Sequence, residues 1–600
     1  MRDRKKSIGL AFPDYIGFEQ HTRRRYSDNQ NNEKQMRSVL LLICLIVGIG
    51  ILFLRLIFLQ LFQGSYYKNL SDTNRIRTSV VHAPRGIIFN RNGVPLVFNV
   101  PGFRTVVNGK TVLLGRETAI SLIANGKKDI EVDSLRQYPF KEVFSHVLGY
   151  IGQISKEELS LTPFSSYESG ELVGKMGIEK EYEKILKGTD GKKLAEVDAM
   201  GKEIRTLGQT DPIPGENITL TLDSKLQQAA FLAMEKVKKG VVIVSTPQGE
   251  ILVLLSKPSF DPNLFTLGEN YKTDQESSYK NISEALLDSE NQPFLNRAIS
   301  GTYPPGSTFK LITAATGLED KVIDQNYEVT DNGVLQIGAF SFANWYFTQY
   351  GKTEGQVNVV KAIKRSNDIF FYKLAEEVGV ERLSQKAKAF GLGERLGIDL
   401  QGEEKGIVPS DEWKKKAMGE PWYLGDTYHY GIGQGYLLTT PLQVNAWTQV
   451  IANGGMLYQQ HLLASSKLKI QSSKLISDKT RELIRQGMIE ACLTGGVAWP
   501  LFEFKVKNSK FKVDGNNFLE APQATTSANF SDYRKVSIAC KTGTAQHGGE
   551  QTLPHAWITL FAPAYDPQIV VTVLVESSGE GSNVAAPIAK KVLEEWFGRQ

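Results

Sequence analysis

The chain has 600 residues and a mass of 66.7 kDa, which is too long for a single domain. A composition of 41% hydrophobic and 22% charged residues excludes wholesale disorder. The net charge is +5, but the tail Met1–Arg37 carries nine Lys or Arg against five Asp or Glu, and Arg55 adds one more positive charge. The residues after Phe62 are therefore formally neutral and lack the positive excess with which proteins bind nucleic acid, so we expect no nucleic-acid partner.

Residues Val39–Phe62 form an apolar run of 24 residues in which only Arg55 and Gln60 are polar. At 1.5 Å per residue this run can cross a bilayer core of about 30 Å, so we expect a transmembrane helix over 38–62. A cleaved signal peptide is the alternative, but the charged lead is too long and no small-residue cleavage site follows. The distribution of basic residues favours a cytoplasmic tail (1–37) and an extracytoplasmic remainder. The flanking basic residues are Arg23, Arg24, Arg25, Lys34 and Arg37 before the run, and Lys68, Arg75 and Arg77 after it.

The segment 63–215 mixes short strand patterns with charged helical stretches. Tyr66–Arg77 has a helical pattern, and residues 80–99 alternate around Asn92-Gly93, a sequence typical of a tight hairpin turn. We expect an elongated α+β domain, called the pedestal below, that ends at the Pro-Ile-Pro-Gly run at 212–215.

The segment 216–600 has strand patterns at its two ends and helical patterns between them. A hairpin is expected over 241–256, and later strands over 536–546, 555–564 and 569–576. Pairing of the two groups predicts an antiparallel sheet covered by helices, in an α+β fold, rather than a doubly wound parallel sheet. Two polar stretches, Gly268–Gln292 and Asn508–Asp532, are typical of surface insertions or loose loops.

Ser307 and Lys310 form an S-x-x-K motif at the start of an apolar helical pattern. Residues i and i+3 share one face of a helix, so the lysine can accept the serine proton if burial lowers its pKa. The pattern also arises by chance, and a serine is an ordinary helix cap, so this motif alone is a weak indication of catalysis.

Two further motifs follow in the same domain. The sequence at 366–368 is Ser-Asn-Asp before an amphipathic helix, where a helix cap is again the alternative. The sequence at 541–544 is Lys-Thr-Gly-Thr inside an apolar strand pattern, and a buried ammonium there requires polar partners. The glycine would permit close approach of another backbone, such as a substrate peptide that pairs along the strand.

In this order, S-x-x-K, S-x-[ND] and K-T-G form the motif set of penicillin-interacting serine enzymes. With it the chain resembles the class B penicillin-binding proteins, and among them the penicillin-binding protein 2 group of cell elongation. The elongation type is indicated by GDTYHYGIGQG, HAWITLFAPA and Asp at 368. The stretches that carry the resemblance are 74–96, 173–204, 297–310, 425–443, 540–546 and 555–564.

The resemblance implies a peptidoglycan D,D-transpeptidase with a dimerisation-type pedestal and a penicillin-binding domain built on a five-stranded antiparallel sheet. Ser307 would attack the D-Ala-D-Ala amide of a stem peptide, with Lys310 as general base, and β-lactams would acylate the same serine. Backbone N–H groups of Ser307 and Thr544 would form the oxyanion hole. The other implied site residues are Ser366 as proton relay, Asp368 and Lys541 in the charge network, and Thr542, Gly543 and Thr544 at the substrate carboxylate.

No cofactor and no metal are expected, because 311–365, where some elongation-type members carry a metal cluster, contains neither Cys nor His. Among Cys44, Cys492 and Cys540 at most one disulfide can form. Alternation on a strand turns Cys540 away from Lys541, so we expect a packed thiol rather than a reactive one.

No glycosyltransferase domain fits within 63–215, so the resemblance implies a polytopic membrane glycosyltransferase as partner. The other expected partners are peptidoglycan stem peptides, β-lactams and the cytoplasmic membrane. Three alternatives remain at this point: a division-type transpeptidase, a non-catalytic scaffold with the same fold, and a β-lactam sensor or hydrolase.

Overall fold

The computed structural model describes residues 29–599 except 108–109, 128–129, 163–164, 166, 199–202, 269–270, 467–468, 508–532 and 550–551. The chain divides into two compact units, and each is described by itself. Most of the predicted tail and the predicted insertion Asn508–Asp532 lie outside the described residues.

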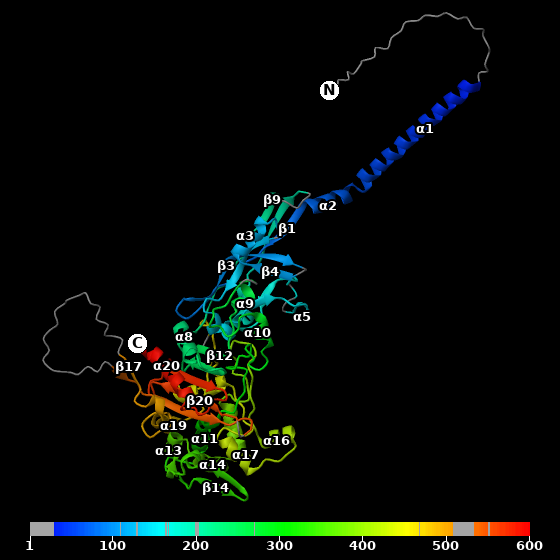
Figure 1. Ribbon diagram of the computed structural model, residues 1–600. Helices are drawn as coiled ribbons and strands as arrows, with labels where there is room; N and C mark the ends of the chain where they lie inside the picture. Colours follow the sequence, from blue (N-terminus) through cyan, green and yellow to red (C-terminus); the bar gives the residue numbers. More distant parts are fainter. Residues whose placement is uncertain are drawn as a thin grey trace, which may run out of the picture. The chain divides into compact units, whose positions relative to one another are not determined.

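The first unit comprises Met1–Ser79 and Lys193–Gln209. Its long helix α1 (Asn29–Ile57) continues through a π-helical turn (Phe58–Phe62) to α2 (Gly64–Arg75) (Figure 1). Gln35–Phe62 is long and apolar enough to cross a membrane, and its side chains are exposed, as expected of a helix that meets lipid. The helix begins before the predicted residue 38, at Asn29. A small sheet in the order β1-β8-β9 follows, from β1 (Ile76–Val81), β8 (Gly191–Val197) and β9 (Glu203–Thr210).

The second unit begins with the remaining part of the pedestal. Its sheet has the order β10-β2-β3-β4, and β5 pairs with β3. The predicted hairpin is confirmed: β2 and β3 are antiparallel, and Gly93 has a φ of +75° in the turn between them. The strands are β2 (Ile88–Phe89), β3 (Pro95–Val107), β4 (Lys110–Leu114), β5 (Ile130–Gln137) and β10 (Ile218–Thr219), the last of which lies beyond the predicted boundary at 215.

A buried ion cluster lies inside the pedestal. Arg85 donates to Glu179 at 2.9 Å and to Glu183 at 2.8 Å, and Arg136 donates to Glu179 at 2.6 Å. Although burial opposes ionisation of Glu179, Arg136 and Arg85 hold its pKa below the ordinary value. The cluster therefore links three distant segments of the pedestal through one carboxylate.

The pedestal is connected to the following segment 216–600 by polar contacts and by a shared apolar core. The Asn263 side chain exchanges hydrogen bonds with the Tyr138 backbone, both at 2.8 Å, and Tyr182 donates to Asp399 at 2.9 Å. One hydrophobic cluster contains Ile178 of the pedestal together with side chains of the large sheet.

The large sheet has the strand order β12-β11-β21-β20-β19, with every neighbouring pair antiparallel. In Figure 1 its strands from near the C-terminus lie against strands more than 300 residues earlier, as predicted. The five-stranded antiparallel fold is confirmed. The strands are β11 (Gly240–Ser245), β12 (Ile251–Lys257), β19 (Ala539–Ala545), β20 (His555–Ala562) and β21 (Ile569–Val575).

Helices cover both faces of this sheet. On one face α8 (Ser224–Ala233) and α20 (Ala585–Gly598) pack together, and on the other lies α18 (Pro441–Ala452). Side chains alternate between the two faces, so that Val242 packs into the first of these layers and Val241 into the second. The same alternation separates Cys540 from Lys541.

The remaining helices and strands belong to the pedestal or to the segments between the strands of the large sheet. Those before the large sheet are α3 (Arg116–Ala124), α4 (Ser145–Leu148), β6 (Ile151–Gln153), α5 (Lys156–Leu159), β7 (Leu172–Gly174), α6 (Gly177–Glu181) and α7 (Glu183–Leu186). The next are α9 (Asn263–Thr266), α10 (Ile282–Leu287), α11 (Lys310–Glu319), β13 (Glu328–Asp331), β14 (Val334–Ile337), β15 (Phe340–Ala343), α12 (Trp345–Tyr350), β16 (Gly355–Asn358), α13 (Val359–Arg365), α14 (Asp368–Val378) and α15 (Val380–Ala389). The last are α16 (Asp411–Met418), α17 (Leu424–Gly431), α19 (Asp478–Ala491), β17 (Lys505–Lys507) and β18 (Tyr533–Lys535).

The polar stretch Gly268–Gln292 is more ordered than its composition predicts. It contains α10, and Tyr279 and Ala285 from it are buried against Phe260 and neighbouring aromatic rings. Two apolar side chains, together with hydrogen bonds such as that from Tyr271 to Asp261, thus hold this polar segment on the protein.

Candidate active site

Ser307 lies on a short 3-10 turn (Gly306–Thr308) that leads directly into α11. Gly306 has a φ of +54°, and its N–H donates to the Gly433 carbonyl at 2.8 Å. Thr308 and Lys310 are buried, whereas Ser307 is partly exposed. The turn therefore leaves Ser307 partly open to solvent between buried neighbours.

The GDTYHYGIGQG stretch holds this turn in place. A Cβ at Gly433 would lie 2.1 Å from the Gly306 carbonyl oxygen, so only glycine permits this approach. The Gln434 side chain donates to the Thr544 carbonyl at 3.3 Å, which links the same loop to β19. The stretch thus supports the turn that carries Ser307, a role that its composition does not reveal.

Lys310 is fully buried one helical turn after Ser307. Its ammonium donates to the Asp368 carboxylate at 2.7 Å and to the Ser366 carbonyl at 2.8 Å, and lies 3.4 Å from the Ser366 hydroxyl. Burial lowers the pKa of Lys310, and the Asp368 charge opposes that shift. A lysine with a lowered pKa can accept a proton near neutral pH.

Ser366 caps the C-terminus of α13 in the left-handed conformation, with a φ of +51°. Its hydroxyl accepts a hydrogen bond from Lys541 at 2.8 Å. A non-glycine residue in this conformation is strained, and such strain is characteristic of functional positions. The strained cap turns Ser366 toward both lysines.

Asp368 is the first residue of α14, where the helix dipole favours a negative charge. One carboxylate oxygen accepts from Lys310 and the other accepts from the Trp345 N–H at 2.9 Å. The Asp368 N–H donates to the Asn344 side chain at 3.2 Å. The carboxylate is therefore held on both oxygens.

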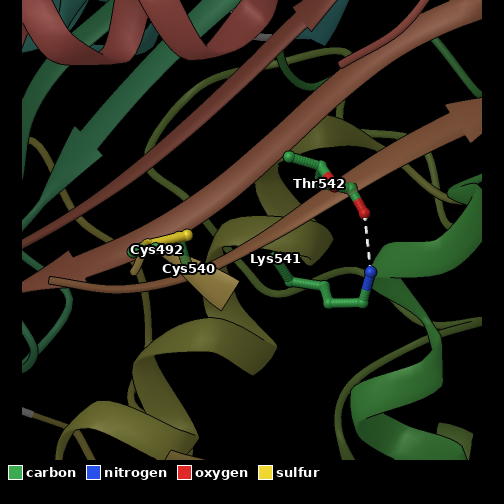
Figure 2. Close-up of a disulfide and its surroundings, with 4 residues drawn as sticks. All are labelled: Cys492, Cys540, Lys541 and Thr542. Atoms are coloured by element: carbon green, nitrogen blue, oxygen red, sulfur yellow. Dashed lines mark hydrogen bonds between the residues drawn. A yellow bond between two sulfur atoms is a disulfide. The ribbon is translucent and has the colours of Figure 1, made fainter. Parts of the chain in front are cut away.

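Lys541 lies on the edge strand β19, and its ammonium also donates to the Thr542 carbonyl at 2.9 Å (Figure 2). Burial and the neighbouring charge of Lys310 push the pKa of Lys541 well below its ordinary value, against the influence of Asp368. Thr542 is buried and Thr544 is exposed at the same edge.

Gly543 accommodates the protein's own backbone. A Cβ there would lie 3.1 Å from both the Pro305 carbonyl oxygen and the Thr308 side chain. The sequence pattern predicts that this glycine accommodates a substrate peptide. The structure adds a reason within the fold, because the turn that carries Ser307 packs directly on the strand.

Cys540 forms a disulfide with Cys492, at a Cα–Cα distance of 6.0 Å. The expectation of a packed thiol is therefore wrong in its chemistry, although the side chain is fully buried and faces away from Lys541 as predicted. Cys492 is the C-cap of α19, so the bond ties the strand of Lys541 to that helix (Figure 2).

Four of the five predicted catalytic residues form one hydrogen-bonded cluster: Lys310, Ser366, Asp368 and Lys541. Ser307 lies beside it on the preceding turn. Sequence reasoning missed Asn344 and the Trp345 N–H, since no motif connects them to the site. Within the described ranges, no three His, Cys, Asp or Glu side chains come together as a possible metal site.

Comparison with protein families gives two matches along the chain. The penicillin binding protein transpeptidase domain matches residues 239–594, and the penicillin-binding protein dimerisation domain matches residues 125–220.

Curated relatives match over nearly the whole chain. The peptidoglycan D,D-transpeptidase MrdA of Acinetobacter baumannii is 32% identical over 93% of this chain and 86% of its own length. The MrdA protein of Escherichia coli K12 is 30% identical over 91% of both chains.

Solved structures agree with these matches. The complex of PBP2 and MreC from Helicobacter pylori has a TM-score of 0.70 and 29% identity, covering 88% of this chain and 99% of that one. Pseudomonas aeruginosa PBP2 in complex with WCK 5153 has a TM-score of 0.65 and 32% identity, covering 87% and 96%. Matches of this length, together with the buried motif cluster, place the chain in one family: it belongs to the class B penicillin-binding proteins, in the MrdA (PBP2) group of peptidoglycan D,D-transpeptidases.

Proposed function

We propose that this enzyme crosslinks peptidoglycan through an acyl-enzyme on Ser307 during cell elongation. The observation that carries the assignment is the buried cluster of two lysines, one serine and one carboxylate beside a partly exposed serine. The kinship with MrdA proteins supports the elongation role.

In the first half-reaction Ser307 Oγ attacks the carbonyl carbon of the D-Ala-D-Ala amide. Lys310 takes the serine proton as the C–O bond forms. The amide C–N bond then breaks, and the leaving D-alanine amine receives a proton through Ser366, whose hydroxyl Lys541 holds. The stem peptide remains as an ester on Ser307.

In the second half-reaction an amine of another stem peptide attacks this ester. The new amide bond forms, the ester C–O bond breaks, and Ser307 recovers its proton. N–H groups of Ser307 and Thr544 would stabilise the oxyanion in both steps, typically by about 3 kcal/mol per donor. The Thr542 and Thr544 hydroxyls, beside Gly543, suit the terminal carboxylate of the donor peptide.

A fluorescent penicillin tests the nucleophile, because β-lactams resemble the D-Ala-D-Ala end. Membranes containing the full chain should show a labelled band near 66.7 kDa. The band should vanish in Ser307→Ala and persist in the matched control Ser300→Ala, a nearby serine whose hydroxyl donates to the Gly402 carbonyl. Labelling that survives Ser307→Ala would contradict the assignment, as would absence of labelling in the wild type.

We further propose a single-pass membrane protein with a cytoplasmic N-terminus and an extracytoplasmic catalytic domain. The apolar span and the basic residues before it support this orientation. The corresponding organisation is a tail (1–37), a membrane helix (38–62), a pedestal (63–215) and a transpeptidase domain (216–600).

The partner we propose is a polytopic membrane glycosyltransferase that polymerises the glycan. A related solved structure, with 27% identity and a TM-score of 0.68, is described as a peptidoglycan synthase complex that coordinates polymerization and crosslinking. Replacing Val39–Phe62 by an unrelated spanning helix should reduce co-purification of the glycosyltransferase from membranes. Unchanged recovery would argue against contacts through the membrane helix.

A further inference from the structure

A second layer of polar side chains lies behind the Lys310 and Asp368 pair. At its centre is Asp331, the last residue of β13, which is 1% exposed. Its two oxygens accept four hydrogen bonds. The donors are the Asn344 side chain at 2.8 Å, the Asn367 side chain at 2.7 Å, the Gly333 N–H at 2.7 Å and the Glu354 N–H at 3.2 Å.

The carboxylate determines which way the two amides point. An ionised carboxylate only accepts hydrogen bonds, so Asn344 and Asn367 must both direct their NH₂ groups toward Asp331. Their carbonyl oxygens then face away, toward the start of α14. There Asn344 accepts from the Asp368 N–H at 3.2 Å and Asn367 accepts from the Phe370 N–H at 2.9 Å.

The Asp331 carboxylate also binds both ends of the segment 333–354, which contacts Asp368. Its contacts to the Gly333 and Glu354 N–H groups bring together the two ends of the segment 333–354. That segment carries the Trp345 N–H, which donates to the Asp368 oxygen not used by Lys310. Asp331 therefore acts on Asp368 by two routes. One passes through Asn344 to the Asp368 backbone N–H, and the other passes through the Trp345 backbone N–H to the Asp368 carboxylate.

We propose that Asp331 is a positioning residue of the transpeptidase reaction, which holds the Asp368 carboxylate against Lys310 through Asn344, Asn367 and the Trp345 N–H. The inference rests on the proposed function of Ser307 and Lys310. It extends the site to a residue that touches neither substrate nor the reacting serine. Asp331 lies 21 residues beyond Lys310 and outside all three motifs.

The Asp331→Asn variant of the full-length protein tests this role. The new amide can accept only through its oxygen, so its NH₂ group must face at least one of the four donors that Asp331 accepts from. Asn344 is then no longer held by a carboxylate and can turn its own NH₂ toward the Asp368 N–H, which would lose its acceptor. We expect the second-order rate of acylation by a fluorescent penicillin to fall by about tenfold or more, since a small displacement of a reacting group is costly.

The pH profile separates positioning from a general loss of stability. The charged groups that contact or act on the Lys310 ammonium are Asp368 from α14 and Lys541 from β19. On the acid side of the profile, the acylation rate falls as Lys310 becomes protonated. If Asp368 moves away, the Lys310 ammonium loses its counter-charge and the pKa of Lys310 falls further, so this acid limb should shift to lower pH. A residue that only stabilises the fold would change the melting temperature and leave that limb in place.

Two further variants complete the experiment. Glu403→Gln is the matched control, because Glu403 is a buried carboxylate that accepts three backbone N–H groups of residues 396–398, away from the site. The swap Asp331→Asn/Asn344→Asp returns an acceptor to the Asp368 N–H and pairs it with an amide donor at 331, so it should recover part of the rate.

The proposal is overturned if Asp331→Asn keeps the acylation rate and pH profile of Glu403→Gln, or if the swap is no faster than the single variant. If Asp331→Asn does not fold, the same measurements are made on Asn344→Ala, which removes the side chain between Asp331 and the Asp368 N–H, and an acylation rate and acid limb equal to those of Glu403→Gln overturn the proposal. Failure of the wild type to label at Ser307 is a different result, because it contradicts the proposed function itself.

Discussion

At the scale of single residues, the site brings together three buried ionisable side chains: Lys310, Lys541 and Asp368. Two lysines share one carboxylate, and burial lowers the pKa of Lys310 and Lys541. Because Asp368 stabilises the charged form of Lys310, it sets how much of this lysine is neutral at a given pH. The pH dependence of acylation therefore reports directly on the pair.

Asp368→Asn should move the acid limb of the acylation profile to lower pH. Removing the carboxylate removes the influence that raises the Lys310 pKa, so the lysine becomes neutral at lower pH. The measurement is the acylation rate by fluorescent penicillin from pH 5 to 9. Asp320→Asn, a partly exposed carboxylate at the end of α11, is the control and should leave the limb unchanged. A limb that stays in place in Asp368→Asn, or moves upward, would refute this account of the pair.

At the scale of elements, the turn Gly306–Thr308, which carries Ser307, lies in close backbone contact with Gly433. Gly433→Ala should lower the acylation rate by about tenfold to a hundredfold, because its Cβ would displace the Gly306 carbonyl, 2.1 Å away. Gly419→Ala is the control, since Gly419 has a similar φ of +75° but its Cβ would meet open space. Comparable acylation rates in the two variants would mean that strain alone, not the contact, matters at Gly433.

The disulfide gives a second prediction for the elements that frame the cleft. Denatured protein should contain one free thiol, from Cys44, and three after reduction. The Cys492→Ala/Cys540→Ala variant should lose about 2–4 kcal/mol of stability, because the bond closes a loop with a sequence separation of 48. Thermal melting measures the loss, and Cys44→Ala is the control. Three free thiols before reduction would show that the bond does not form.

The same elements show how far sequence reasoning reaches. The apolar patterns over 536–546 and 569–576 predict the strands. The opposite faces of Cys540 and Lys541 follow because side-chain direction has a period of two on any strand. The three motifs predict the residues at the centre of the candidate site, namely Ser307, Lys310, Ser366, Asp368 and Lys541. Asp331 and Asn344 could not be predicted, since they reach Asp368 through side-chain contacts between residues 13 to 36 positions apart, which no local pattern reveals. The Cys492–Cys540 bond likewise depends on the tertiary placement of α19 beside β19.

At the scale of the whole molecule, the buried ion cluster of the pedestal contains none of the candidate site residues. Arg85→Met would leave Glu179 and Glu183 with less compensation, so it should destabilise the pedestal by about 3–5 kcal/mol. The acylation rate well below the melting temperature should stay the same, because Arg85 contacts no site residue. Arg205→Met, which removes an exposed guanidinium that pairs with Glu196, is the control and should cost clearly less stability.

This ion cluster also has a predicted pH dependence. The pKa of Glu179 is lowered in the folded protein, so its contribution is present above the ordinary pKa of a glutamate and is lost as the pH falls through the lowered value. The melting temperature of the protein should therefore fall on acidification. In Arg85→Met that fall should be smaller, and an equal fall in both proteins would exclude Glu179 as the source.

The central claim is that Ser307 carries the acyl group, and peptide mapping after reaction with a β-lactam tests it most directly. Trypsin releases Ser307 in the peptide Ala298–Lys310. The account predicts that this peptide gains the mass of one β-lactam, with fragment ions that locate the adduct on Ser307 and not on Ser300. An adduct on any other residue, or an unmodified Ala298–Lys310 peptide in protein that has reacted, would contradict it.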